Sequence, residues 1–311
     1  MRSKLMKIQM LLWLAAFGAY PWAAEMNGFE IDGDTLVPID AIHSGGPPRD
    51  GIPAIDAPVF LGPLDTQDLK PTDRVLGLFH RGIAKAYPVA IMNWHEIVND
   101  RFSGSPVVIT YCPLCGSGMA FAAQIGETEL TLGVSGLLYN SDVLLYDRQS
   151  GSLWSQMLSL AISGPMRGTR LNLLPLVHTT WGEWRNEHPD TQVLSRSTGY
   201  QRDYDRDPYS GYIDSTGIWF PVANRDSRYH PKERVLGVEI GGRYKAYPFS
   251  ELSRKPGSHF DNFAGKRLEV VYSQEGETAR VFDGQQEVAA IISFWFAWVA
   301  FHPDTEVYLS E

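Results

Sequence analysis

The alternation of apolar and polar positions along residues 74–88 recurs along residues 234–248. The first stretch reads RVLGLFHRGIAKAYP, and the second reads RVLGVEIGGRYKAYP. In each, two short runs with the composition of β-strands flank a glycine-containing turn, His80-Arg81-Gly82 in the first and Gly241-Gly242 in the second. This pattern predicts a β-hairpin at both places.

The correspondence between the two stretches continues downstream. A run between a tyrosine and a phenylalanine reads CPLCGSGMA in the first copy, and at the same offset it reads SQEGETARV in the second. A later segment with two tryptophans and the motif HPDT also recurs, at residues 181–191 and 295–305. The repetition predicts an internal duplication in which Cys112 and Cys115 align with Ser273 and Gly276. Only the first copy therefore carries thiols.

Three further elements are predicted from periodicity. Residues 91–100 have helical spacing of apolar positions, and residues 107–111 form a β-branched and aromatic strand that leads to Cys112. Residues 289–301 are apolar but too short to span a bilayer, so we expect a buried helix or short segment between the two copies.

The first copy also contains an insertion. Phe121 and Trp181 are much further apart than their counterparts Phe282 and Trp295, which implies about 47 additional residues in the first copy. The inserted sequence predicts a strand, a turn, a second strand and a hairpin with Gln149-Ser150-Gly151 at its tip.

These patterns predict a β-rich α+β fold made of two related subdomains from an internal duplication, the first with an inserted pair of β-hairpins. We therefore expect a signal peptide at residues 1–24, an extended lead-in at 25–72, a first repeat unit with the CxxC motif and the insertion at 73–198, a connector at 199–231 and a second repeat unit without cysteines at 232–311.

Composition and charge exclude some partners. The 311 residues are 44% hydrophobic and 20% charged, with a formal net charge of −9, which disfavours nucleic acid as a partner. Residues 1–24 combine basic residues with a short apolar run and a small-residue end, the pattern of a secretion signal. We expect an exported protein, with the periplasm as its compartment and no stable membrane span beyond this signal.

The chemistry of the chain centres on Cys112 and Cys115. Two thiols at this spacing can hold one soft metal ion, form a small reducible disulfide, or stay as structural core residues. A zinc ribbon would need a second cysteine pair, and covalent haem attachment would need a histidine where Gly116 stands. Neither a GxSxG nucleophile elbow nor an HExxH helix is present, so the sequence gives little support for a hydrolase.

Two residues are the first candidates to complete a metal site. His95 lies on the predicted helix just before the cysteine strand, and its counterpart segment in the second copy lacks a histidine. Met119 offers a thioether, which suits Cu(I), so copper is preferred over zinc. The unremarkable alternatives are a packing histidine and a core methionine. His188 and His302 occur in both copies in the same HPDT motif and are expected to be structural.

A second group of polar and aromatic residues lies on the inserted hairpins. These residues could line a cleft over the cysteines and bind a small ligand, although turn and salt-bridge roles are the ordinary alternative. The candidates are Asn140, Asp142, Asp147, Arg148, Trp154 and Gln156.

Several of these segments resemble a known family. The segments are DGIPAIDAPVF (50–60), NWHEIVND (93–100), TYCPLCGSG (110–118), GVSGLLYNSD (133–142) and YDRQSGSLWSQ (146–156). They are similar to the bacterial and archaeal family called domain of unknown function 3179, and the resemblance runs from about Asp50 to the C-terminus. It implies an exported or membrane-associated protein whose shared motifs include both cysteines, and it implies no activity.

Three functions remain open from the sequence, and whether the protein is an enzyme is left undecided. The first is binding or handling of a soft metal ion, copper or zinc, through Cys112 and Cys115. The second is thiol–disulfide redox chemistry by the same pair. The third is a ligand- or partner-binding module in which a structural disulfide braces the loop.

Overall fold

The computed structural model describes residues 24–66 and 68–310. About 43% of the chain is in strands and 10% in helices, so the β-rich prediction is confirmed. The predicted signal peptide, residues 1–24, lies outside the described residues except for Ala24. Among the described residues, no helix is both long and apolar enough to cross a bilayer.

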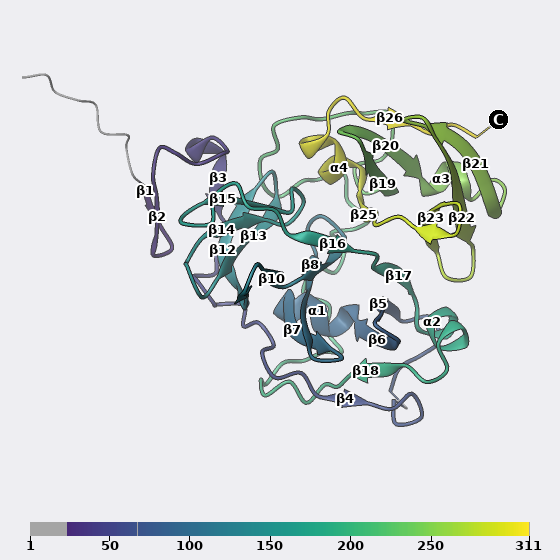
Figure 1. Ribbon diagram of the computed structural model, residues 1–311, viewed down its shortest axis with the longest axis horizontal. Helices are drawn as coiled ribbons and strands as arrows, with labels where there is room; N and C mark the ends of the chain where they lie inside the picture. Colours follow the sequence, from purple (N-terminus) through teal and green to yellow (C-terminus); the bar gives the residue numbers. More distant parts are fainter. Residues whose placement is uncertain (1–23, 67, 311) are drawn as a thin grey trace, which may run out of the picture.

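The strands of the described residues form five sheets of four or five strands, arranged as a propeller-like ring (Figure 1). Two short hairpins, β1 (Ala24–Met26) with β2 (Phe29–Ile31) and β10 (Gln124–Ile125) with β11 (Thr128–Glu129), are additional. The first sheet has the order β17 (Val177–Thr180), β5 (Arg74–His80), β6 (Ile83–Pro88), β18 (Gln192–Leu194), β4 (Phe60–Leu61). The second has the order β16 (Asn172–Leu174), β9 (Ser117–Ala122), β8 (Ser105–Cys112), β7 (Ile97–Phe102).

The other three sheets complete the ring. The third has the order β15 (Leu160–Ser163), β14 (Leu153–Ser155), β13 (Asp142–Asp147), β12 (Leu132–Tyr139), β3 (Ile42–Ser44). The fourth has the order β25 (Ile291–Phe294), β19 (Arg234–Ile240), β20 (Arg243–Pro248), β26 (Glu306–Val307). The fifth has the order β21 (Gly257–Phe263), β22 (Lys266–Ser273), β23 (Thr278–Asp283), β24 (Gln286–Glu287). The helices are η1 (Ile39–Ala41), α1 (Val89–His95), α2 (Trp181–Glu187), α3 (Phe249–Leu252) and α4 (Trp295–Phe301).

The prediction of two subdomains with an inserted pair of hairpins was wrong as a description of the whole molecule. The inserted strands β12 to β15 pair with β3 from the lead-in and so form a complete sheet of the ring. The lead-in also supplies β4 to the first sheet. Alternation in a sequence indicates hairpins, but it does not say which distant strand will pair with their exposed edges.

Segments with matching sequence nevertheless have matching local structure. The hairpin β5–β6 pairs Gly77 with Ala86, and the hairpin β19–β20 pairs Gly237 with Ala246. Each glycine lies under a tryptophan: a Cβ on Gly77 would collide with the ring of Trp184, and one on Gly237 with the ring of Trp298. Only glycine allows this close approach, which explains why RVLG occurs in both segments.

The histidines of the repeated HPDT motif are structural, as predicted. His188 packs against the Trp184 ring at 4.1 Å between centroids, and His302 packs against Trp298 at 4.3 Å. Each tryptophan also donates its indole hydrogen to the threonine of the motif, Thr191 or Thr305.

The predicted helix over residues 91–100 is shorter than expected. Helix α1 ends at His95, because Glu96 adopts a left-handed conformation with φ of 57°. Residues 97–102 then form β7, which pairs with β8 along its whole length. The apolar spacing of residues 91–98 does not distinguish a helix from a strand, because both elements bury residues there.

The apolar stretch of residues 289–301 is buried, as expected. It divides into strand β25 and helix α4, in which Trp295 and Trp298 are 0% and 1% exposed. Strand β25 lies against β9 of the second sheet, and the backbone N–H of Phe294 donates to the carbonyl of Cys115 at 2.8 Å. Strand β17 lies in the same way against β23. These two contacts define the seam between the matching regions.

Candidate metal centre

The two cysteines lie on the hairpin β8–β9. Cys112 ends β8 and pairs with Ser117, the first residue of β9, and Cys115 belongs to the turn between them. The turn is closed by a hydrogen bond from the Cys115 N–H to the Cys112 carbonyl at 3.2 Å. Gly116 has φ of 58°, and a Cβ there would lie 2.7 Å from the Phe294 ring. The glycine thus lets the turn pack tightly against the seam.

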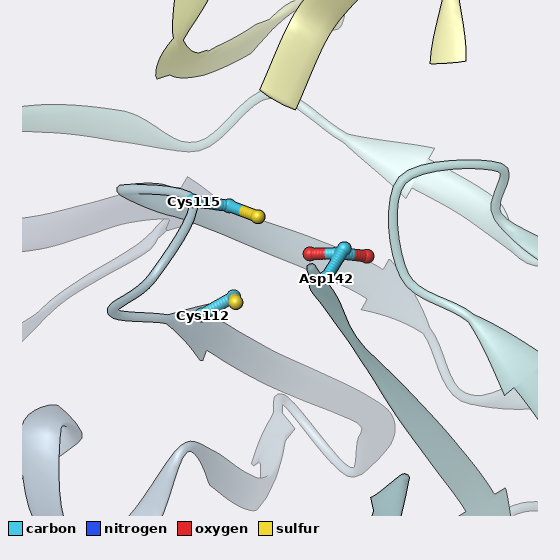
Figure 2. A group of neighbouring side chains, drawn as sticks. All are labelled: Cys112, Cys115 and Asp142. Carbon is cyan, nitrogen blue, oxygen red and sulfur yellow. The ribbon is translucent and has the colours of Figure 1, made fainter. Parts of the chain in front are cut away.

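A carboxylate from the inserted segment meets the two thiols. Asp142 begins β13, directly after Asn140 and Ser141, which both adopt left-handed conformations in the β12–β13 turn. Its carboxylate and the two Sγ atoms lie within 4.8 Å of one another, and Figure 2 shows them pointing toward a common space. All three side chains are buried, with at most 2% of any exposed.

Polar neighbours fix this group in place. Asp142 accepts a hydrogen bond from the Met157 N–H at 3.1 Å. The Ser117 hydroxyl donates to Gln156 Oε1 at 3.0 Å, and Gln156 Nε2 donates to the Thr110 hydroxyl at 2.7 Å. These buried hydrogen bonds hold the side chains in defined positions.

Burial dominates the electrostatics of the centre. It raises the pKa of both thiols, and the nearby Asp142 carboxylate raises both further. Burial also raises the pKa of Asp142 to about 7. Glu96, which is 7% exposed, has its pKa raised to about 8 by burial and then by repulsion from Asp142. Burial thus favours the protonated form of each of these groups, so a bound metal ion would compete with protons for the donors.

His95 does not reach the cysteines. One ring nitrogen, Nδ1, is 2.8 Å from the Pro53 carbonyl, and the other, Nε2, is 2.7 Å from the Tyr204 hydroxyl. Both nitrogens are therefore already engaged in a structural hydrogen-bond chain, which leaves neither for a metal. The sequence placed His95 near the cysteine strand correctly, but the direction of its side chain depends on the end of α1.

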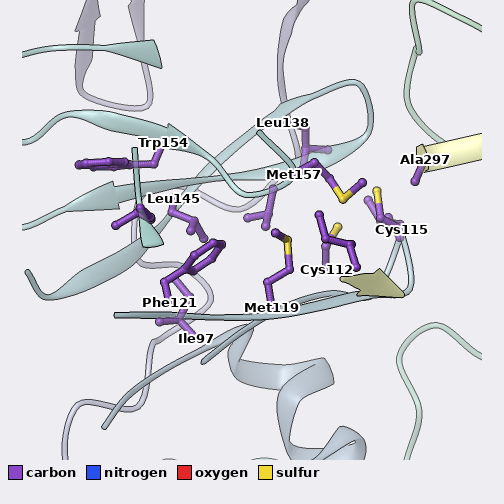
Figure 3. Close-up of a cluster of buried hydrophobic side chains, with 14 of the residues drawn as sticks. Ile97, Cys112, Cys115, Met119, Phe121, Leu138, Leu145, Trp154, Met157 and Ala297 are labelled. Carbon is purple, nitrogen blue, oxygen red and sulfur yellow. The ribbon is translucent and has the colours of Figure 1, made fainter. Parts of the chain in front are cut away.

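The second predicted metal ligand, Met119, packs in the same part of the core as the two cysteines. It pairs with Thr110 across β8–β9 and packs in the buried cluster that contains both cysteines (Figure 3). Met157 belongs to the same cluster, although nothing in the sequence pattern singles it out. Its placement depends on the turn between β14 and β15, which carries no recognisable motif.

The six candidates from the inserted hairpins separate into two groups. Asp142 lies beside both cysteines, and Gln156 is hydrogen-bonded to Ser117 and Thr110 of the cysteine hairpin. The Asn140 side chain donates to the Ala300 carbonyl at 3.1 Å and accepts from the Ala223 N–H at 2.8 Å, so it ties the insertion to α4 and the connector.

The remaining candidates have structural partners. Asp147 accepts hydrogen bonds from the Ser150 hydroxyl at 2.7 Å and from the Trp154 indole at 2.9 Å, which organises the turn after β13. Arg148 forms an ion pair with Asp56 at 2.5 Å. These contacts correspond to the turn and salt-bridge roles expected as the alternative to a cleft over the thiols.

Part of the connector packs in the same buried cluster as the centre, which the sequence did not indicate. Tyr212 packs in the same buried cluster as the cysteines, and the Lys232 ammonium lies 4.0 Å from the centroid of its ring. Near the other end of the connector, the Trp94 indole donates to the Arg206 carbonyl at 3.2 Å. The buried cluster around the centre therefore includes residues of the cysteine hairpin, the insertion, the connector and the segment β25–α4.

Comparison with known proteins places the chain in a family. The model of a family described as "Protein of unknown function (DUF3179)" matches residues 49–292. The chain belongs to the DUF3179 family. Membership confirms the resemblance seen in the sequence, but it brings no activity, so function has to be argued from the site. No curated protein and no solved structure matches the chain.

Proposed function

We propose that this DUF3179 protein binds one thiophilic metal ion through Cys112, Cys115 and Asp142. The observation that carries the proposal is the meeting of two thiols and a carboxylate, from two different hairpins, within 4.8 Å. Burying three ionisable groups together costs free energy. A cation offsets this cost, which gives a physical reason for the arrangement.

The donor set favours a divalent ion such as Zn²⁺. The sequence favoured copper because it offered a thioether and an imidazole, but His95 is engaged elsewhere. Asp142 supplies a hard oxygen donor and adds a third negative charge to those of two thiolates. Zn²⁺ accepts both sulfur and oxygen ligands and neutralises more of this charge than Cu(I) does. Copper is the second candidate, since the thioethers of Met119 and Met157 pack in the same cluster.

Because the centre is enclosed, we favour a metal-binding role rather than catalysis on a substrate. Three protein donors leave one position of a tetrahedral ion open, which is the arrangement of catalytic zinc sites. Here, however, the donors are at most 2% exposed. We therefore propose metal storage, transfer or structural stabilisation, in which the ion reaches the donors through displacement of the connector.

We also propose that the protein acts outside the cytoplasm, on the strength of the leader-like sequence of residues 1–24. An oxidising compartment converts neighbouring thiols to a disulfide unless a metal or a reductant holds them. The two proposals therefore support each other. Cell fractionation tests the location: we expect the full chain in the periplasmic fraction, and recovery in the cytoplasm alone would contradict the proposal.

Thiol–disulfide exchange is the second candidate function, because the two sulfur atoms are close. Both cysteines are free thiols in the structure, so the alternative of a structural disulfide is not what the structure shows. Burial and the raised pKa of each thiol oppose attack on a partner's disulfide, which requires an accessible thiolate. A reduction potential below about −300 mV would exclude a catalytic role for the pair.

Metal analysis of the purified chain tests the main proposal. After loading with Zn²⁺ and dialysis, we expect about one equivalent in the wild type. We expect less than a tenth of that in the Cys112→Ser/Cys115→Ser variant, and a loss of affinity of about tenfold or more in Asp142→Asn. Asp283→Asn, which removes an exposed carboxylate paired with Lys266, is the matched control. Equal metal content in all four proteins would overturn the proposal.

A further inference from the structure

The seam between the matching regions holds two arginines at corresponding positions. Arg74 begins β5 and Arg234 begins β19. Both Nη1 atoms approach the same oxygen of Glu277, at 3.8 Å and 3.6 Å. The arginine side chains are 28% and 22% exposed, whereas that of Glu277 is 61% exposed. Two largely buried cations thus share one mostly solvated anion.

The hydrogen-bond and ring partners of the arginines are uncharged, and Glu233 is the other carboxylate whose charge acts on Arg234. Arg74 donates to the Gly276 carbonyl at 2.7 Å and to the Glu277 carbonyl at 3.3 Å. The Arg234 guanidinium lies 4.7 Å from the centroid of the Phe249 ring. The carboxylate of Glu233 is directed to the Ser250 N–H at 2.7 Å. Burial lowers the pKa of both arginines, and repulsion from Arg234 helps to lower that of Arg74 to about 9.

Two threonines that contact Gly276 carry buried hydroxyls, and the hydroxyl of Thr179 faces the glycine. The oxygens of Thr179 and Thr278 have no hydrogen-bond partner within residues 24–66 and 68–310, and the residues are only 1% and 6% exposed. A Cβ on Gly276 would lie 2.7 Å from Thr179 Oγ1 and 3.1 Å from the methyl carbon of Thr278. Buried hydroxyls in native proteins normally have a partner.

Two tyrosines at corresponding positions flank the arginines. Tyr111 is the last residue but one of β8, and Tyr272 is the last residue but one of β22. The seam therefore gathers two pairs of matched hydrogen-bond donors, arginine and tyrosine, around one place. This concentration of positive charge stands out in a chain whose formal net charge is −9.

We propose that Arg74 and Arg234 bind a small oxyanion in the seam, either a mineral oxyanion such as phosphate or sulfate, or the carboxylate of a small organic acid. Guanidinium groups present parallel N–H donors that match the oxygen spacing of these anions. The bound anion displaces Glu277 toward solvent and supplies the charge that the two arginines lack. This site is separate from the metal centre, although Tyr111 directly precedes Cys112.

Calorimetric titration of the full chain tests the site. The probes are phosphate, sulfate, acetate and succinate, each at constant ionic strength set with chloride. We expect saturable binding of one anion per chain, weakened about tenfold or more in Arg234→Met through loss of a charge-assisted contact. Glu277→Gln removes the competing carboxylate, so we expect binding about threefold tighter or better. Tighter binding of phosphate and sulfate than of acetate and succinate identifies a mineral oxyanion, and the reverse order identifies a carboxylate.

The control is Arg243→Met, because Arg243 is an exposed arginine, 57% accessible, that is paired with Glu306 away from the seam. We expect its anion affinity to equal that of the wild type. Equal affinity in Arg234→Met and wild type would overturn the proposal, as would the absence of saturable binding for all four anions. If Arg234→Met does not fold, Glu277→Gln decides the matter, and unchanged or weaker binding in that variant counts against the site.

Discussion

The turns of the hairpins β8–β9 and β22–β23 occupy corresponding positions but have different surroundings. In the first, Cys112 and Cys115 face the inserted segment and are at most 2% exposed. In the second, the Ser273 hydroxyl accepts the Gly276 N–H at 3.1 Å and donates to Glu183 at 3.0 Å. The same backbone frame thus supports a turn closed by a serine hydroxyl on one side and a pair of thiols on the other. The difference indicates that the thiols are not needed to close the turn.

Each of the two turns also packs against the other region across the seam. The Cys115 carbonyl accepts the Phe294 N–H of β25, and the Gly276 carbonyl accepts a hydrogen bond from Arg74 of β5. Each region therefore depends on the other for the shape of its turn. This reciprocal contact makes the second region part of the support of the cysteine turn.

The largest expected difference between the regions concerns a buried ion pair that both contain. Lys85 and Asp100 are 2.8 Å apart with side chains 7% and 5% exposed, whereas the corresponding Lys245 and Asp261 are 11% and 16% exposed. We expect Asp100→Ala to lower the free energy of unfolding by about 4 kcal/mol, since it leaves a buried lysine unpaired. Asp261→Ala is expected to cost about half as much, because water reaches that pair more readily. Urea denaturation measures both, and a larger loss in Asp261→Ala would contradict this account.

The two turn glycines provide a second contrast. Gly116 has φ of 58°, and a Cβ added there would lie 2.7 Å from a ring carbon of Phe294, so alanine is both strained and crowded. We expect Gly116→Ala to destabilise the protein by about 3 kcal/mol. Gly276→Ala meets only the movable Thr179 hydroxyl and the Glu183 and Thr278 side chains, and we expect about 1 kcal/mol. Thermal unfolding distinguishes them; equal losses would show that the cysteine turn is not the tighter one.

A further, pH-dependent difference between the regions concerns Glu96. In the strand register of the second region its counterpart is Gly257, which has no ionisable side chain. The folded-state pKa of Glu96, about 8, lies above the ordinary glutamate value of 4.5. Its contribution to stability is therefore complete below pH 4.5 and is lost as the pH rises toward 8. We expect the metal-free wild type to lose more stability than Glu96→Gln between about pH 5 and pH 8, at up to about 1.4 kcal/mol per pH unit. Parallel pH profiles of the two proteins would show that this carboxyl is not protonated in the folded state.

The sequence predicted those parts of the fold that depend on local pattern. The repeated hairpins follow from alternation around glycine turns, and the buried segment at 289–301 follows from its apolar composition. The end of α1 was missed because a left-handed residue such as Glu96 leaves no reliable trace in composition. The third sheet was missed because β3 and β12 are far apart in the chain, and pairing over such distances is not encoded in either strand alone.

The candidate site was predicted in part for similar reasons. Cys112 and Cys115 were evident from their spacing, and Asp142 was selected only as a possible cleft residue. Its place beside the two thiols depends on the left-handed turn at Asn140 and Ser141, which directs β13 toward the cysteines. His95 was close in sequence, but hydrogen bonds to Pro53 and Tyr204 turn its ring away.

The central claim is that two thiolates and a carboxylate share one metal ion, and titration with Co²⁺ tests it most directly. Cobalt replaces zinc in sulfur sites and gives an absorption band from each bound thiolate. We predict that the band saturates at one equivalent, falls to about half in Cys112→Ser, and keeps its height but needs more cobalt in Asp142→Asn. No thiolate band in the wild type, or one that is unchanged in Cys112→Ser, would contradict the account.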